Sequence, residues 1–200
     1  TIRGGTLGAR LAAVGETVKL LNGKTYELDE TDIVIADGEG PIGLAGIMGG
    51  GESEVSDETK NIVLEVATFD MYTLRKTSMR HGVFTDALTR FNKGQSPLQN
   101  ATVLRKLLDM IIELSGGSQA GDMFDIPASD DKHRPYGNSL TVKSDFINAR
   151  LGLELENDEI ARLLRNTEFD IETAEDGLEL RAPFWRTDIE EPEDIVEEVG

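Results

Sequence analysis

The segment "TVKLLNGKTYEL" (17–28) is the feature that most constrains the fold of the first half of the chain. It holds two strand-like runs joined by Asn22-Gly23, a pair that favours a two-residue turn between antiparallel strands. Two more short runs, 32–37 and 41–47, surround another glycine-containing turn and also predict strands. We therefore expect antiparallel strands that pair through local turns.

After these strands the pattern changes. The apolar run 61–67 predicts one further, buried strand. Asp70 is then placed to cap a short helix that ends at His81-Gly82. Residues 81–94 are expected to be irregular.

The strongest helical pattern of this half begins at Ser96-Pro97, because proline suits the first position of a helix. Gly116-Gly117 ends it. One face of this helix is apolar, with Leu104, Leu107, Leu108, Ile111 and Ile112. Strands followed by helices predict an α+β fold, with a mixed α/β first domain over residues 1–122.

A polar, proline-containing segment predicts a linker over residues 123–138. A second domain over residues 139–200 would then begin with a short strand. Ser144 and Asn157 are placed to cap two helices, and a hairpin is expected to turn at Asp176-Gly177. Two helices followed by a hairpin are typical of a winged-helix-like domain.

Composition excludes several classes of function. The chain has no cysteine, which excludes disulfide scaffolds, thiolate metal sites and thiol nucleophiles. No apolar run approaches the ~20 residues that cross a bilayer, so we expect no membrane association. The lack of cysteine fits a reducing compartment, and we expect a cytoplasmic location. The chain starts without Met and stops inside an acidic run, as expected of a piece of a longer protein.

The net charge of −18 argues against a general nucleic-acid binder, because lysine and arginine drive contact with phosphate. The charge is uneven, however. Residues 154–200 hold 17 acidic and four basic residues, whereas residues 71–110 hold seven basic and two acidic ones. If any part contacts a polyanion, it is the stretch 71–110, although a solvated helix face explains the same pattern.

Glu65 is the first candidate site residue, since an ionised carboxylate within an apolar run is costly unless it is hydrogen-bonded or faces a cavity. In one interpretation it lies on an edge strand and points to water. In the other it lines a pocket, where Gly49 and Gly50 let a ligand approach backbone N–H groups. Thr85 and Ala87 would add a small hydroxyl and a small apolar surface. The residues alone leave both interpretations open.

A second candidate site lies in "WRTDIEEPEDIVEEV". Pro192 favours a helix start, which places Asp194, Glu197 and Glu198 on one face. Like charges so placed repel unless a cation lies between them, and Asp188 could complete an oxygen-rich site of the kind that Mg2+ accepts. The alternative is an acidic helix start that suits the helix dipole.

The sequence does not indicate nucleophilic catalysis, nucleotide binding or a zinc site. Neither His81 nor His133 has a nucleophile or a ligand partner at a recognisable spacing, and no phosphate-loop, dinucleotide or zinc motif is present. A covalent hydrolase is therefore not indicated.

Three segments, "LAGIMGGGESEVSDETKNIVLE", "RKTSMRHGVFTDALTRFNKG" and "APFWRTDIEEPEDIVEEV", resemble the beta subunit of bacterial-type phenylalanine–tRNA ligase. The resemblance runs through almost the whole chain, in the order and spacing of that family. It implies a tRNA-editing domain, followed by a winged-helix-like domain. It also implies a heterotetramer of two alpha and two beta subunits that charges phenylalanine tRNA with the use of ATP and Mg2+.

The resemblance also assigns roles to residues. Aminoacylation would take place in the alpha subunit, whereas the editing domain would hydrolyse tyrosine wrongly attached to the tRNA. Gly49 would line the tyrosine end of the editing pocket, Glu65 would accept a hydrogen bond from the tyrosine hydroxyl, and Thr85 and Ala87 would line the pocket. The metal-associated acids would be Asp188, Asp194, Glu197 and Glu198, in a Mg2+ site shared with the alpha subunit.

Two features depart from the family pattern. Asn92 stands where the family usually has glutamate. The family's His-Ala-Phe-Asp motif, whose histidine lines the editing site, is expected upstream of residue 1, so no catalytic residue is assigned here. Two other functions compete with this interpretation: a free-standing hydrolase of mischarged tRNA, and a non-enzymatic acidic interaction module.

Overall fold

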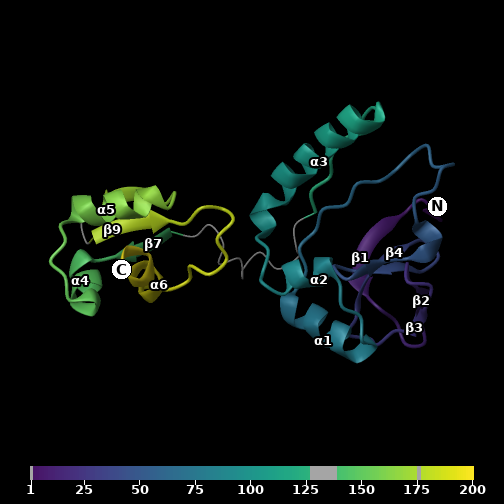
Figure 1. Ribbon diagram of the computed structural model, residues 1–200, viewed down its shortest axis with the longest axis horizontal. Coiled ribbons are helices and arrows are strands. Elements are labelled where there is room, and N and C mark those ends of the chain that lie inside the picture. The colour runs from purple at the N-terminus through teal and green to yellow at the C-terminus, as the bar shows by residue number, and fades with distance from the viewer. Residues whose placement is uncertain (1, 127–138, 175–176) are drawn as a thin grey trace. The chain divides into compact units, whose positions relative to one another are not determined.

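The computed structural model describes residues 2–126, 139–174 and 177–200 (Figure 1). The chain folds as two compact units, Thr1–Gln95 and Ser96–Gly200. Both contain antiparallel strands and helices, which confirms the α+β class. The division lies before the predicted linker 123–138, most of which falls outside the described residues.

The first unit is built on a four-stranded antiparallel sheet and a separate two-stranded hairpin. In the sheet the order is β1-β4-β5-β6. The strands are β1 (Leu7–Leu11), β4 (Ile33–Asp37), β5 (Pro41–Leu44) and β6 (Met48–Gly49), with β2 (Thr17–Lys19) and β3 (Thr25–Glu27) in the hairpin.

The predicted hairpin is confirmed, but its turn holds three residues, Leu21, Asn22 and Gly23, because the Leu20 N–H donates to the Lys24 carbonyl at 3.0 Å. Gly23 has a φ of 77°, a conformation that glycine adopts without strain, and its N–H donates to the Leu20 carbonyl at 2.9 Å. The same turn joins the hairpin to the sheet, because the Leu21 N–H donates to the Gly49 carbonyl at 3.0 Å. The hairpin therefore supports the strand that carries Gly49.

Two helices follow, α1 (Met71–His81) and α2 (Asp86–Phe91). The predicted cap of α1 is confirmed, because the Asp70 carboxylate accepts a hydrogen bond from the Thr73 N–H at 2.7 Å. The expectation of an irregular segment over 81–94 is wrong. Thr85 caps α2, which at six residues is too short to show a helical period in the sequence.

The predicted strand over 61–67 is also wrong. Within the described part of the chain, this segment makes no strand pairing, and Ile62 and Val63 are 47% and 63% exposed. After β6, which is two residues long, the chain passes into a 3-10 turn, η1 (Gly51–Ser53). An apolar run forms a strand only where it meets a partner edge, and the residues 61–67 do not themselves supply one.

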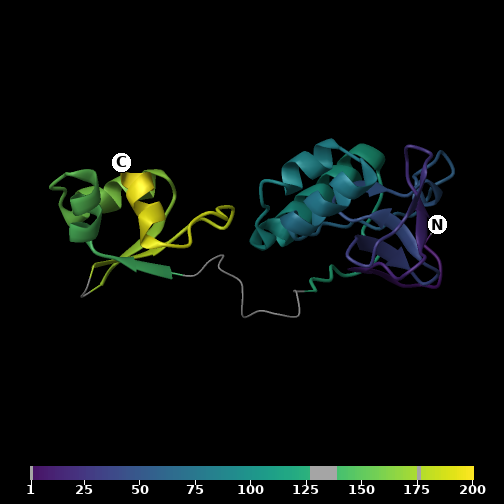
Figure 2. The same cartoon turned by 90° about the horizontal axis from the view of Figure 1, so that it is seen from below.

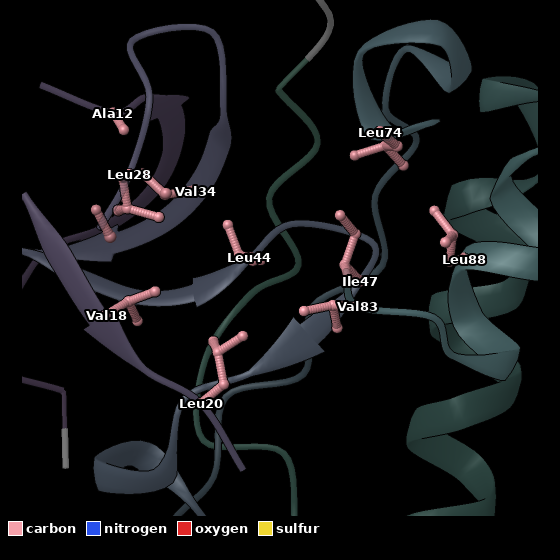
Figure 3. Close-up of a cluster of buried hydrophobic side chains, with 11 residues drawn as sticks. Ala12, Val18, Leu20, Leu28, Val34, Leu44, Ile47, Leu74, Val83 and Leu88 are labelled. Carbon is pink, nitrogen blue, oxygen red and sulfur yellow. The ribbon is translucent and has the colours of Figure 1, made fainter. Parts of the chain in front are cut away.

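The core of this unit lies between the sheet, the hairpin and the two helices (Figure 3). Strands contribute Val18, Val34 and Leu44, and helices contribute Leu74 and Leu88. These side chains come from segments far apart in the sequence, so their burial fixes α1 and α2 against the strands.

The second unit begins with a 3-10 turn, η2 (Pro97–Gln99), and α3 (Asn100–Ser115). The predicted helix start is confirmed, with the Ser96 hydroxyl accepting from the Leu98 N–H. Gly116 ends α3 in the left-handed conformation, also as predicted. None of the α3 side chains is fully buried.

The rest of this unit is a three-stranded antiparallel sheet of order β7-β9-β8, with three helices (Figure 2). Its strands are β7 (Ser139–Val142), β8 (Asp170–Ala174) and β9 (Gly177–Arg181), and its helices are α4 (Ser144–Leu151), α5 (Asn157–Asn166) and α6 (Pro192–Val199). A separate apolar core, including Ile147, Ile160 and Ile195, holds them together.

Two predicted caps in this unit are wrong by one residue. Lys143 and Glu156 occupy the cap positions of α4 and α5, and neither side chain bonds to the helix. Ser144 and Asn157 are instead the first helical residues, and their side chains hydrogen-bond to each other. The hairpin is present, but the predicted turn residue Asp176 lies outside the described residues.

Among the helices that the structure describes, none has the length and apolar character needed to cross a membrane.

Candidate functional site

The turn between β5 and β6 is where the predicted pocket segments meet. Gly46 in this turn has a φ of 64°, and a Cβ there would lie 2.7 Å from Leu74 Cδ1 and 3.1 Å from Phe91 Cδ2. A third side chain, that of Phe69, would be 3.2 Å away. Only glycine allows such close packing at this φ, so Gly46 lets the segment after Glu65 and the end of α2 approach the turn.

Thr85 ties α2 to the same turn. Its hydroxyl donates to the Ile47 carbonyl at 2.8 Å and accepts from the Leu88 N–H at 3.1 Å. The first bond joins residues 38 positions apart, and the second caps α2. Ala87, in the first turn of α2, is exposed.

Gly49 lies on β6, opposite Gly43 on β5, and is exposed. A Cβ at Gly49 would meet Leu21 Cδ1 at 3.5 Å, an ordinary contact. The backbone of Gly49 is therefore accessible, and its position is fixed by strand pairing.

Glu65 lies in the irregular segment before α1 and is exposed as a whole residue. Neighbouring atoms nonetheless crowd its carboxyl, and this partial desolvation raises the pKa of Glu65. In the part of the chain that the structure describes, the carboxyl has no hydrogen-bond or ion-pair partner. Phe69, four residues later, packs on the glycine turn, so the structure brings the Glu65 segment to the turn without a hydrogen bond from Glu65 itself.

Asn92, at which the sequence resemblance implies a glutamate, ends α2. Its side-chain oxygen is buried and has no hydrogen-bond partner among the described atoms. A carboxylate in its place would carry a charge into the same surroundings, which costs more than a neutral amide.

A cavity of about 380 Å³ opens beside this region, but none of the four predicted pocket residues lines it. Its walls include Arg3, Lys19, Glu39 and Gly50.

Sequence reasoning missed a polar cluster around Asp32. The Asp32 side chain is fully buried and accepts hydrogen bonds from Thr77 and Arg80, both at 2.7 Å, and contacts His81 Nε2 at 2.6 Å. His81 therefore has a carboxylate partner that no spacing in the sequence indicates. A separation of 45 to 49 residues leaves no local pattern from which the cluster could be found.

Burial by itself raises the pKa of Asp32, but hydrogen bonds from His81, the Asp29 N–H and Thr77 outweigh it. The pKa of Asp32 therefore lies below its usual value. The carboxylate is ionised and anchors the end of α1 to the start of β4.

In the second unit the predicted acids are only partly gathered. Asp188 and Glu198 both contact Arg186 Nη2, each at 2.7 Å. The hydrogen bond from Arg186 holds the pKa of Asp188 below its usual range. Glu197 is exposed on α6.

Asp194 stabilises the start of α6 instead of pairing with Arg186. Its carboxylate accepts hydrogen bonds from the backbone N–H groups of Glu190 and Glu191, both at 2.8 Å, in a capping box at the start of α6. Across the described ranges, no three acidic or histidine side chains are arranged to hold a metal ion. Arg186 already neutralises the charges of Asp188 and Glu198, so these two acids do not fit Mg2+ in this arrangement.

Comparisons with known proteins cover both units. The B3/4 domain family matches residues 1–116, and the tRNA synthetase B5 domain family matches residues 140–200. The phenylalanine–tRNA ligase beta subunit of Lactobacillus johnsonii is 39% identical over 100% of this chain, and that of Geobacter metallireducens is 37% identical over 100%. The chain spans about a quarter of these relatives, 24% of each.

A solved N-terminal fragment of the phenylalanyl-tRNA synthetase beta subunit from Pyrococcus horikoshii also matches. It aligns with 97% of this chain and 55% of its own, at 16% identity and a TM-score of 0.43. The sequence matches are much stronger, and they follow the chain from end to end. The chain therefore belongs to the B3/4 domain family, joined to a B5 domain as in a segment of the phenylalanine–tRNA ligase beta subunit.

Proposed function

We propose that the chain is part of a phenylalanine–tRNA ligase beta subunit, and that its first unit forms much of a site that hydrolyses tyrosine wrongly attached to phenylalanine tRNA. The whole enzyme would be a cytoplasmic heterotetramer of two alpha and two beta subunits. It would charge tRNA with phenylalanine, with ATP and Mg2+, through chemistry in the alpha subunit.

The observation that carries this proposal is the convergence on one turn of two segments, the segment that follows Glu65 and the helix α2 with its cap. Phe69 and Phe91 both pack on Gly46, and Thr85 bonds to the Ile47 carbonyl. The turn continues into the accessible backbone of Gly49. Rigid support around an open glycine suits a pocket that must distinguish two amino acids of nearly equal size.

Glu65 supplies the chemistry of this discrimination. Its unpaired, partly desolvated carboxyl can accept a hydrogen bond from the hydroxyl of tyrosine, which phenylalanine lacks. A hydrogen bond to a charged group contributes roughly 1.5–3 kcal/mol, or about 10- to 150-fold in selectivity. Phenylalanine would leave the carboxyl unmatched, which widens the difference.

These residues bind and select, and we assign no hydrolytic group among them. Positioning of the acceptor end provides much of a hydrolytic rate, and the alpha subunit and the rest of the beta subunit would contribute to it. We therefore expect the isolated 200-residue chain to be inactive towards tyrosyl-tRNA.

The test is deacylation of tyrosyl- and phenylalanyl-tRNA by the full heterotetramer that carries Glu65→Ala. We expect discrimination to fall about 10- to 150-fold while hydrolysis continues. Glu58→Ala, at another exposed glutamate of the first unit, is the matched control and should keep normal discrimination. If Glu65→Ala also keeps it, Glu65 is an ordinary surface residue and the proposed role is wrong.

A further inference from the structure

The hydroxyl of Thr85 has no proton left for a ligand. A threonine hydroxyl has one O–H to donate and two lone pairs with which to accept. In this chain the O–H goes to the Ile47 carbonyl at 2.8 Å, and one lone pair accepts from the Leu88 N–H at 3.1 Å. The Thr85 carbonyl is engaged as well, by the Thr89 hydroxyl at 3.1 Å.

We propose that Thr85 is a positioning residue that holds the turn leading to Gly49, and that it does not donate to the substrate. This inference rests on the proposed editing function for its biological meaning. The geometric part, that Thr85 sets the shape of the turn, stands on the structure alone.

The turn needs such a support on its helical side. Gly46 has no side chain to restrict its backbone, and its φ of 64° is one of several conformations open to glycine. On the other side the turn is held by backbone hydrogen bonds, from the Leu21 N–H to the Gly49 carbonyl and from the Gly50 N–H to the Ile42 carbonyl. Thr85 supplies the matching hydrogen bond from α2.

The same hydroxyl couples two structures. Because it caps α2 and also holds the Ile47 carbonyl, the turn keeps its shape only while the first turn of α2 is formed. Ile47 itself is 3% exposed, so an unpaired carbonyl there would not readily find water. Loss of the hydroxyl should thus loosen the turn two residues before Gly49.

The first experiment measures amide hydrogen exchange in the ligand-free 200-residue chain. The reporters are the Ile47 and Gly50 N–H groups, which bond to Leu44 and Ile42. Thr85→Val keeps the shape and removes the hydroxyl, so exchange at both amides should rise about 5- to 150-fold. Thr85→Ser keeps the hydroxyl and should restore the original rates.

The matched control is Thr89→Val, which removes a hydroxyl from the same helix that bonds only to the Thr85 carbonyl. Thr89→Val should leave hydrogen exchange at the Ile47 and Gly50 amides unchanged. If Thr85→Val does not fold, Thr85→Ala is measured in its place and interpreted in the same way. Unchanged exchange in the variant without the hydroxyl would overturn the proposal, because a residue that acts only on substrate has no effect on the free chain.

The second experiment measures tyrosyl-tRNA hydrolysis by the full enzyme. Thr85→Val should lower kcat, Thr85→Ser should recover it, and the effects of Thr85→Val and Gly49→Ala should be non-additive. Additive effects would contradict action through the turn. The two proposals can be rejected separately. If Thr85→Val alters amide exchange but Glu65→Ala keeps normal discrimination, Thr85 still positions the turn, and the proposed editing site is wrong.

Discussion

His81 Nε2 lies 2.6 Å from a carboxylate oxygen of Asp32, although 49 residues separate them in the chain. Both side chains are shielded, with 8% of the His81 side chain and none of the Asp32 side chain exposed. Thr77 and Arg80 donate to the other Asp32 oxygen. These contacts fasten the last turn of α1 to the start of β4, and α1 in turn supplies Leu74 to the glycine turn.

We expect Asp32→Asn to destabilise the chain by about 3 kcal/mol at pH 7, since it removes one partner of a buried, hydrogen-bonded charge cluster. The pKa of Asp32 is lower in the folded than in the unfolded chain. Its stabilising effect is therefore complete above the unfolded pKa of about 4 and is lost as the pH falls through the folded pKa.

Urea unfolding from pH 7 to pH 2 measures this difference. The free energies of unfolding of the wild type and Asp32→Asn should converge as the pH falls. Asp57→Asn, at an exposed aspartate, is the control and should follow the wild type throughout. A constant gap between wild type and Asp32→Asn at every pH would show that ionisation of Asp32 does not matter.

Adjacent glycines should respond very differently to alanine. A Cβ at Gly50 would lie 2.2 Å from the Ile42 carbonyl oxygen, whereas a Cβ at Gly49 meets only Leu21 at 3.5 Å. We expect Gly50→Ala to lower stability by about 1–3 kcal/mol through overpacking, and Gly49→Ala by less than about 0.5 kcal/mol. Thermal unfolding of both variants decides the matter, and equal losses would contradict the described strand register.

The charge of Glu65 should slightly destabilise the folded chain at neutral pH. Its pKa is raised in the folded chain by desolvation, so folding favours the protonated form, and stability falls as the pH rises above the unfolded pKa of about 4.3. Glu65→Gln should therefore be slightly more stable than the wild type at pH 7, by less than about 0.5 kcal/mol, because the site is largely open to solvent.

The gain should vanish at pH 3, where the glutamate is neutral in both states. Chemical denaturation at the two pH values measures it, with Glu58→Gln as the control. A variant that is less stable than the wild type at pH 7 would indicate that the Glu65 carboxylate has a partner in the folded chain.

Sequence signals that act over a few residues predicted local structure correctly. Asn22-Gly23 predicts its turn, and Asp70 predicts its cap, because each acts within three or four residues. The run 61–67 failed because a strand needs a partner edge, which its own residues do not reveal. The pattern did not predict the helix α2, because six residues are too few to show a helical period.

The site shows the same limit. Gly49, Thr85 and Ala87 could be chosen from motifs, yet the packing of Phe69 and Phe91 on Gly46 depends on contacts across the fold. The partners of Asp32 were hidden for the same reason. In the second unit the acids lie close together in the sequence, but their spacing does not reveal that Arg186, two residues before Asp188, pairs with Asp188 and Glu198.

Arg186 should weaken the binding of Mg2+ by the acids around it. Hydrogen bonds from Arg186 to Asp188 and Glu198 raise the already high pKa of Arg186, so the guanidinium stays charged and occupies the place a cation would take. Asp194 is bound to backbone N–H groups. The isolated chain should therefore bind Mg2+ weakly, since the ion prefers to keep its waters where few ligands are offered.

Arg186→Gln removes the competing charge and leaves Asp188 and Glu198 facing each other without a cation. We expect this variant to bind Mg2+ more tightly than the wild type in titration calorimetry, by about 5- to 10-fold, which corresponds to about 1 kcal/mol. Arg162→Gln, which frees only Glu159 on α5, is the control and should bind like the wild type. Tight, stoichiometric binding by the unmodified chain, or no gain in Arg186→Gln, would show that Arg186 does not block a cation at these acids.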